Sequence, residues 1–254
     1  MTADPVAPLP DPIPDAETLP GLPRIRNGTM LTETIAFDGK AVLDVGSGDG
    51  RLARLMAKAG ARVVLGLEVE DRQLAHALAG PPTPGVAFLK CGGEVLPLPD
   101  QSADVIVYFN SLHHLPGVPA MQAAMAEAAR VLTPGGLLYM AEPIAAGGFF
   151  ALTKLVDDET VVRAQAYGVL LNLASGSLPL SLVQETLYTN TLKEPSFALL
   201  KTRMTSISPA RDAAFSAAEP ELAALFVSQG IAVAEEPEAR LFEQPMRMML
   251  FRKD

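Results

Sequence analysis

The sequence predicts an α/β fold, a mostly parallel sheet with helices on both faces. Short apolar runs alternate with helical segments from residue 41 to residue 142, and the links between them are short. Such alternation is typical of βαβ units. In addition, the glycines and distinctive polar residues follow the apolar runs. Parallel sheets bind their ligands at these carboxyl strand ends.

Residues 41–90 predict three strands joined by two helices, that is, two successive βαβ units. The run AVLDV (41–45) predicts a buried strand, and RLARLMAKAG (51–60) places apolar residues at helical spacing before a terminating glycine. A strand, a helix and a strand are expected next, at 62–68, 70–80 and 86–90. A glycine and two prolines end that second helix.

Three further elements complete the alternating region. ADVIVYF (103–109) predicts a fourth strand, and VPAMQAAMAEAARVL (118–132) predicts a long helix that stops at TPGG. LLYMAE (137–142) predicts a fifth strand, so five strands are expected by residue 142.

The alternation ends after the fifth strand. Residues 146–210 contain helical stretches at 157–174 and 181–192 and no convincing strand, so we expect a helical insertion or cap. Its apolar composition suggests a small organic acceptor that is partly hydrophobic. The alternatives for this apolar segment are an ordinary packing surface and the interface of a homodimer.

The C-terminal part is expected to return to the sheet. Residues 220–230 predict a helix, and 238–244 and 246–253 predict a closing antiparallel strand pair. The chain is therefore divided into a proline-rich N-terminal arm (1–28), a core (29–145 and 211–254) and the insertion (146–210).

Composition and charge exclude several classes of protein. The net charge is −9, and no basic face for a nucleic acid is visible. The N-terminus lacks the basic and apolar regions of a signal peptide, and no apolar run of about 18 residues predicts a membrane span. The single cysteine, Cys91, excludes a disulfide framework and a cysteine-rich metal site. We therefore expect a cytoplasmic protein.

A glycine-rich turn follows the first strand. After Asp44, the glycines at 46, 48 and 50 form the pattern GxGxG, which allows a tight turn and close approach of backbone N–H groups to a ligand. The helix that follows adds the positive end of its dipole. A dinucleotide fingerprint would need a glycine where Arg51 stands, so pyrophosphate binding is disfavoured.

Glu68 lies 18 residues beyond Gly50, at the end of the second strand. An acid at this position can accept hydrogen bonds from both hydroxyls of an adenosine ribose. The alternative for the glycines alone is a generic tight turn. With Asp44 before the turn and Glu68 after the second strand, a nucleoside site is favoured.

Five segments in order resemble the class I S-adenosylmethionine-dependent methyltransferases: VLDVGSGDG, GLEVE, GEVLPLPDQSADVIV, LHHLP and RVLTPGG. The resemblance covers roughly residues 40–143 and is closest to the small-molecule branch that includes the ubiquinone and menaquinone biosynthesis methyltransferases. It implies a Rossmann-like, doubly wound, mostly parallel seven-stranded sheet with an antiparallel C-terminal strand. The helical insertion would follow strand five.

The resemblance also implies a function. S-adenosyl-L-methionine would be the cofactor, and its methyl group would pass to a small organic acceptor by in-line displacement. The alternative is a non-catalytic protein that binds S-adenosylmethionine or S-adenosylhomocysteine and regulates or scaffolds a partner. The expected partner is a small-molecule substrate, with no nucleic acid.

The resemblance assigns residues to the cofactor. The methionine part would face the glycine turn, Glu68 would hold the ribose, and Phe109 and Asn110 would lie beside the sulfonium. The family often has GDAExLPxPD after strand three, whereas this chain has CGGEVLPLPD, with Gly92 at the acid position. The adenine would then meet Glu94 or nearby backbone. The predicted set is Asp44, Gly46, Ser47, Gly48, Gly50, Leu67, Glu68, Gly93, Glu94, Val95, Phe109 and Asn110.

Candidate general bases are few. His113 and His114 lie just beyond strand four, near the predicted position of the methyl group, and a histidine has a suitable pKa. Of the two, His114 is preferred. The alternative is that the pair shapes the pocket or caps the next helix. Glu142, at the end of strand five, is expected either to contact the substrate or to hydrogen-bond the neighbouring loop.

An acidic cluster precedes the predicted helix 157–174. Asp157, Asp158 and Glu159 stand at its start, where carboxylates interact favourably with the helix dipole. The alternative is metal binding, which is disfavoured because no histidine or further carboxylate is near them in sequence. We therefore predict no metal site.

Overall fold

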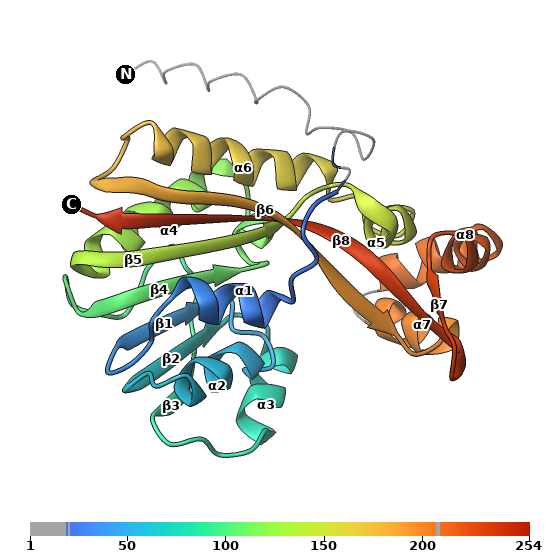
Figure 1. Cartoon of the computed structure of the whole chain (residues 1–254), viewed down its shortest axis with the longest axis horizontal. Coiled ribbons are helices and arrows are strands. Elements are labelled where there is room, and N and C mark those ends of the chain that lie inside the picture. The colour runs from blue at the N-terminus through green and yellow to red at the C-terminus, as the bar shows by residue number, and fades with distance from the viewer. Residues whose placement is uncertain (1–18, 20, 207–208) are drawn as a thin grey trace.

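The structure is a computed structural model that describes residues 19, 21–206 and 209–254. At its centre is an eight-stranded sheet with the order β3-β2-β1-β4-β5-β8-β6, and β7 is added by pairing with β8 (Figure 1). The five strands from β3 to β5 pair in parallel, and β8 runs antiparallel to both β5 and β6. This confirms the prediction of a mixed α/β fold with a mostly parallel sheet. The strands are β1 (Ala41–Val45), β2 (Val63–Glu68), β3 (Val86–Lys90), β4 (Ala103–Phe109), β5 (Leu132–Pro143), β6 (Leu180–Glu194), β7 (Ile231–Val233) and β8 (Glu236–Lys253).

Helices cover both faces of the sheet. Successive side chains of a strand point to opposite faces, so Val105 of β4 packs toward one layer and Ile106 toward the other. One layer contains α1 and α2, and the other contains α4 and α6. The helices are α1 (Asn27–Thr34), α2 (Arg51–Lys58), α3 (Asp71–Ala79), α4 (Val118–Val131), α5 (Gly147–Thr153), α6 (Thr160–Ala174), α7 (Phe197–Thr205) and α8 (Pro209–Ser228), with a 3₁₀ turn η2 (Leu112–His114).

The prediction of a helix at 181–192 is wrong. These residues belong to β6, which pairs with β8 from Leu180 to Glu194. The local apolar spacing suggested a helix, but pairing with a strand more than 40 residues later in the chain satisfies the backbone instead. The segment after strand five is therefore not wholly helical. The sheet also has eight strands, where seven were expected.

The strand pair predicted at the C-terminus is one continuous strand, β8, which runs through Pro245 without a break. The Pro245 carbonyl accepts a hydrogen bond from the N–H of Ile144 at 2.9 Å, so the N–H that proline lacks would face the same side. The Ile144 carbonyl, which would be the acceptor of that N–H, instead accepts a hydrogen bond from the N–H of Ala146 at 2.8 Å, so it is not left unpaired. Proline is tolerated at this position for that reason.

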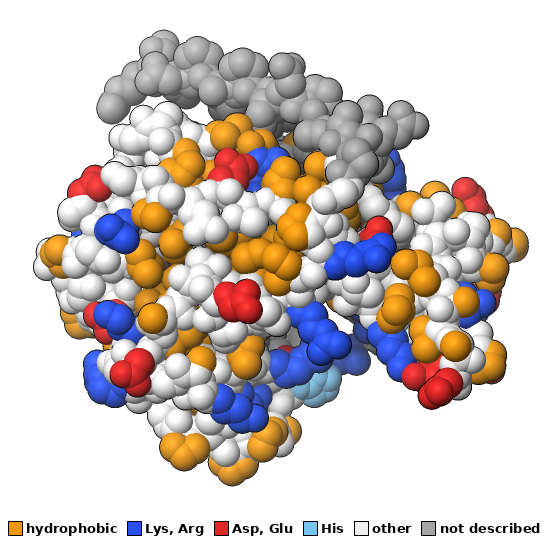
Figure 2. Space-filling view, viewed as in Figure 1, with side chains coloured by type: hydrophobic (Ala, Val, Ile, Leu, Met, Phe, Trp, Pro, Cys, Tyr) orange, Lys and Arg blue, Asp and Glu red, His pale blue; other side chains and the backbone are white. Residues whose placement is uncertain are grey.

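A separate lobe is built on the far ends of β6 and β8. Figure 1 shows α5, α7, α8 and β7 grouped there. Its core is a cluster rich in phenylalanine, in which the rings of Phe226 and Phe242 lie 5.4 Å apart. Lysine and arginine side chains gather in the notch between the lobe and the sheet core (Figure 2). Basic side chains thus gather at the notch although the chain as a whole is acidic.

The N-terminal arm and a membrane span are the remaining features that the sequence addressed. Most of the predicted arm lies outside the described residues, and α1 begins at Asn27, within that arm. Among the helices that the structure describes, none has the length and apolar character needed to span a bilayer.

Candidate functional site

The glycine turn lies between β1 and α2 and has an unusual backbone. Gly46, Gly48 and Gly50 have φ values of 74°, 55° and 75°, in the left-handed region that favours glycine. A Cβ on Gly46 would lie 2.4 Å from the Cβ of Ser111, so the turn packs directly on the loop after β4. A Cβ on Gly48 would meet nothing within 4 Å. There is therefore no room for a side chain at Gly46, whereas the backbone at Gly48 borders open space.

Glu68 ends β2 and fastens the turn. Its side chain is buried, and its two carboxylate oxygens accept hydrogen bonds from the N–H groups of Gly48 and Glu70, each at 2.8 Å. Each carboxylate oxygen has a second lone pair for another donor. A ribose with two hydroxyl donors is chemically matched to this carboxylate, and Glu68 stays its predicted acceptor.

Three buried polar atoms near the turn have no hydrogen-bond partner among the described residues: Asp44 Oδ2, Ser47 Oγ and Asn110 Oδ1. Asp44 and Asn110 lie at the carboxyl ends of β1 and β4, which are neighbours in the sheet. Buried polar atoms are rarely left unpaired, so their grouping indicates a polar ligand. Burial raises the pKa of Asp44 to about 7, and the charge of Glu68 adds to the shift. A cationic ligand would relieve both effects.

The loop after β3 is fastened to α4. Glu127 accepts a hydrogen bond from the N–H of Leu96 at 2.7 Å, and Arg130 donates to the carbonyls of Leu96 and Leu98 at 3.1 and 2.9 Å. The predicted adenine-side residues Gly93, Glu94 and Val95 lie on this anchored loop.

Gly92 stands where the family often has an acid, and the structure shows what fills that space. A Cβ on Gly92 would lie 2.5 Å from a carboxylate oxygen of Glu94, so the Glu94 side chain folds back over position 92. Leu67 was expected near the adenosine. Its side chain is fully buried in the core, and its carbonyl accepts hydrogen bonds from Gly46 and Ser47 at 2.8 and 2.9 Å.

Glu142, at the end of β5, holds the loop that carries the two histidines. One carboxylate oxygen accepts hydrogen bonds from the N–H groups of Ser111 and Leu112 at 3.2 and 2.9 Å. The other oxygen pairs with Nδ1 of His113, whose side chain is buried. Of the two roles expected for Glu142, the structure shows the contact with the neighbouring loop.

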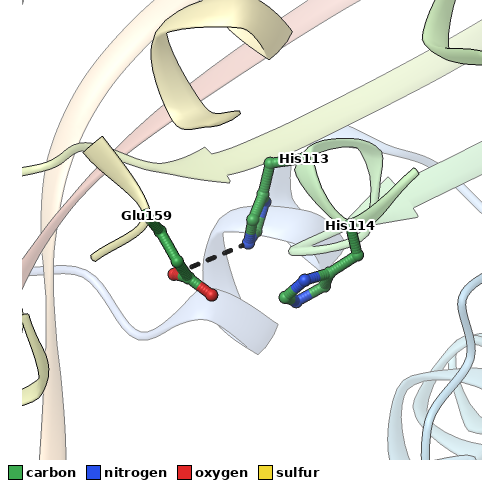
Figure 3. Close-up of side chains that lie close together, drawn as sticks. All are labelled: His113, His114 and Glu159. Atoms are coloured by element: carbon green, nitrogen blue, oxygen red, sulfur yellow. Dashed lines mark ion pairs between the residues drawn. The ribbon is translucent and has the colours of Figure 1, made fainter. Parts of the chain in front are cut away.

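Glu159 meets the histidine pair. Its Oε2 lies 3.9 Å from Nε2 of His113, and the ring centroids of His113 and His114 are 4.1 Å apart. Figure 3 shows the Glu159 carboxylate pointing at the two imidazoles, with its second oxygen directed toward His114. Arg163 donates two hydrogen bonds to Oε2 of Glu159, at 3.1 and 2.6 Å.

The two imidazoles have opposite pKa shifts. Burial would lower the pKa of His113, but the charge and hydrogen bond of Glu142, with the charge of Glu159, raise it above its usual value. Burial lowers the pKa of His114, and the charge of His113 lowers it further. The pKa of Glu159 is lowered in spite of its burial, mainly by the charge of Arg163.

The acidic cluster before α6 divides into three different roles. Asp158 accepts a hydrogen bond at 3.0 Å from the N–H of Thr160, the first residue of α6. Asp157 pairs with Arg211, and Glu159 lies with the histidines. The functional neighbourhood of Glu159 was missed because the histidines come from the loop after β4. The only local signal was its spacing of four residues from Arg163.

The sheet order, the glycine turn and the acid after β2 fit an α/β protein of the class I methyltransferase type. Residues 43–140 match the family model described as a methyltransferase domain. These residues therefore form a domain of the class I S-adenosylmethionine-dependent methyltransferase type, as the five sequence segments predicted, and the prediction of this cofactor is confirmed with it. The resemblance to the branch of ubiquinone and menaquinone biosynthesis stays a prediction.

Two curated relatives illustrate the match. An uncharacterized methyltransferase of Mycobacteroides abscessus is 36% identical over 121 residues, which cover 46% of this chain and 45% of that protein. The 27-O-demethylrifamycin SV methyltransferase of Amycolatopsis mediterranei is 34% identical over 123 residues, which cover 45% of this chain and 44% of that protein. The chain thus spans about half the length of these curated relatives.

A solved structure resembles most of the chain. The crystal structure of a Bacillus halodurans C-125 protein aligns with a TM-score of 0.62, covering 89% of this chain and 98% of that one, at 20% sequence identity. At this identity, the likeness concerns the fold alone.

Proposed function

We propose that the protein transfers a methyl group from S-adenosylmethionine to a small organic acceptor by in-line displacement. The observation that carries this proposal is the set of unpaired buried polar atoms around the glycine turn. Asp44 would receive the cationic methionine end of the cofactor, and Glu68 would accept from the ribose hydroxyls. Asn110 would lie beside the sulfonium, which makes the methyl group electrophilic when the cofactor is bound.

The acceptor would approach from the side of the histidine pair. Asn110 is followed within four residues by His113 and His114, so these rings, with Glu159 beside them, would lie close to the predicted methyl position. The protein's contribution would be to hold a nucleophile in line and to exclude water. Such positioning can contribute roughly 7–11 kcal/mol to lowering the barrier.

One relative supports a small molecule as the acceptor. The Amycolatopsis protein is named for 27-O-demethylrifamycin SV, a small organic compound. A cytoplasmic location, a homodimer and the absence of a nucleic-acid partner remain predictions from the sequence.

The experiment is a calorimetric titration with S-adenosylhomocysteine, followed by a screen for transfer of an isotope-labelled methyl group to a metabolite library. We expect binding with 1:1 stoichiometry and labelling of a small product. Binding without transfer to any acceptor would favour the regulatory or scaffolding alternative. No binding by well-folded protein would refute both functions.

A further inference from the structure

We propose that His113, His114 and Glu159 bind a divalent first-row transition-metal ion beside the cofactor site. Each residue offers one ligand atom, and the three atoms lie within 4.8 Å of one another. The ligands come from η2 and from the residue that precedes α6, so the fold brings together groups that are remote in sequence (Figure 3).

The spacing of the ligand atoms is close to that of a bound ion. Bonds of about 2.0–2.1 Å in tetrahedral geometry place neighbouring ligand atoms roughly 3.3 Å apart. One carboxylate oxygen of Glu159 lies within 4.8 Å of a ring nitrogen of each histidine, and its Oε2 is 3.9 Å from Nε2 of His113. A small inward movement of Glu159 and of His114, which is exposed, would close the site.

His113 already has the hydrogen-bond partner that a metal-binding histidine needs behind it. Metal-ligating histidines usually donate their other ring N–H to a carboxylate, which fixes the tautomer and orients the ring. Glu142 plays this part for His113, because its carboxylate accepts a hydrogen bond from Nδ1–H. Nε2 is then the ring nitrogen that faces Glu159. Glu142 is itself held by the N–H groups of Ser111 and Leu112.

Arg163 limits the strength of this site without blocking it. Both of its hydrogen bonds to Glu159 end on Oε2, so the lone pairs of Oε1 are not used by the guanidinium. Figure 3 shows this second oxygen on the side of His114. Because the arginine charge repels a cation, we expect weaker binding than in closed structural zinc sites.

The ligand set selects the type of ion. Two imidazoles and one carboxylate suit Zn²⁺, Co²⁺ or Fe²⁺, whereas Mg²⁺ and Ca²⁺ prefer ligand sets made of oxygen. Three protein ligands leave a position open, as in catalytic zinc sites. This step rests on the proposed function: an acceptor oxygen would occupy the open position, and the ion would favour its deprotonated form. The acceptor class would then be a hydroxyl or phenol compound.

The test uses the full chain, freed of metal with a chelator and titrated with Co²⁺, followed by its visible absorption, and with Zn²⁺, followed by calorimetry. We expect one ion per chain and no binding of Mg²⁺ at the same concentration. His114→Ala and Glu159→Gln should each weaken binding by about tenfold or more, and Glu142→Gln by about 10–100-fold.

Matched controls come from the chain itself. It has three histidines and one cysteine, so His76→Ala and Cys91→Ser remove the remaining imidazole and the thiol, and both should bind metal like the unchanged protein. Thermal unfolding checks that each variant is folded. Absence of binding to the unchanged protein, or full binding by both His114→Ala and Glu159→Gln, would overturn the proposal. Titration with S-adenosylhomocysteine tests the proposed function independently of metal.

Discussion

Glu68 accepts a hydrogen bond from the backbone N–H of Gly48 at 2.8 Å, which joins the end of β2 to the open part of the glycine turn. The same carboxylate is the predicted acceptor for the ribose. Glu68→Gln should weaken S-adenosylhomocysteine binding by about 1–3 kcal/mol, because charge-assisted hydrogen bonds become weaker ones. Calorimetry measures this change. Glu70→Gln, an exposed acid two residues away, is the control and should leave the affinity unaltered.

Asp44 should make cofactor binding depend on pH. Its pKa is raised from 3.8 to about 7, so a protonated fraction exists in the cofactor-free protein below neutral pH. A cationic cofactor selects the carboxylate, so affinity for S-adenosylmethionine should fall as pH drops below about 7, by up to roughly tenfold per pH unit. Titrations between about pH 5 and pH 8 test this. Asp44→Asn should bind weakly and lose the dependence, and a wild-type affinity that is flat with pH would contradict the assignment.

The same carboxyl group affects stability in the opposite direction. A carboxyl whose pKa is raised by folding contributes most at low pH, and this contribution is lost as pH rises from about 4 through 7. Asp44→Asn should therefore stabilise the cofactor-free protein above pH 7 by about 2–4 kcal/mol, and the gain should vanish in acid. Urea unfolding at several pH values measures it. Asp38→Asn, at an exposed position, should show no such gain.

Gly46→Ala should destabilise the fold by about 2–4 kcal/mol, because it combines a strained φ with a contact of 2.4 Å to the Cβ of Ser111. Gly48→Ala is a matched control with a similar φ and nothing within 4 Å, so it should cost only the backbone strain. In a double-mutant cycle, Ser111→Gly should recover part of the loss from Gly46→Ala. Equal losses for the two alanine variants would show that the contact with Ser111 is unimportant.

Arg130 should support adenosine binding from a distance. Its guanidinium holds the carbonyls of Leu96 and Leu98, so Arg130→Met should loosen the loop and raise the dissociation constant of S-adenosylhomocysteine about three- to tenfold. Because the histidine cluster is built from other elements, Co²⁺ binding should be unaffected. Arg62→Met, at an exposed position at the amino end of β2, is the control.

The first part of the fold was predictable because its signals are local. Each strand from β1 to β5 was anticipated, since every one is a short apolar run next to a helix start or a glycine turn. The glycine pattern and Glu68 were found for the same reason, because chain order alone places them at neighbouring strand ends.

The second part depends on contacts between distant residues. β6 is a strand because β8 pairs with it, and β8 continues through Pro245 because this pairing does. Similarly, no local pattern connects His113 with Glu159. Such features follow from tertiary pairing, which propensity and periodicity do not encode.

The long antiparallel pair of β6 and β8 belongs to both parts of the molecule. Toward one end it forms the outer edge of the sheet, and toward the other it carries the phenylalanine-rich lobe (Figure 1). Two-stranded ribbons twist more strongly than wide sheets. The lobe is also held by Arg72 of α3, whose guanidinium donates hydrogen bonds to Ser206. The width of the notch is therefore set jointly by the twist of the ribbon and by this one arginine.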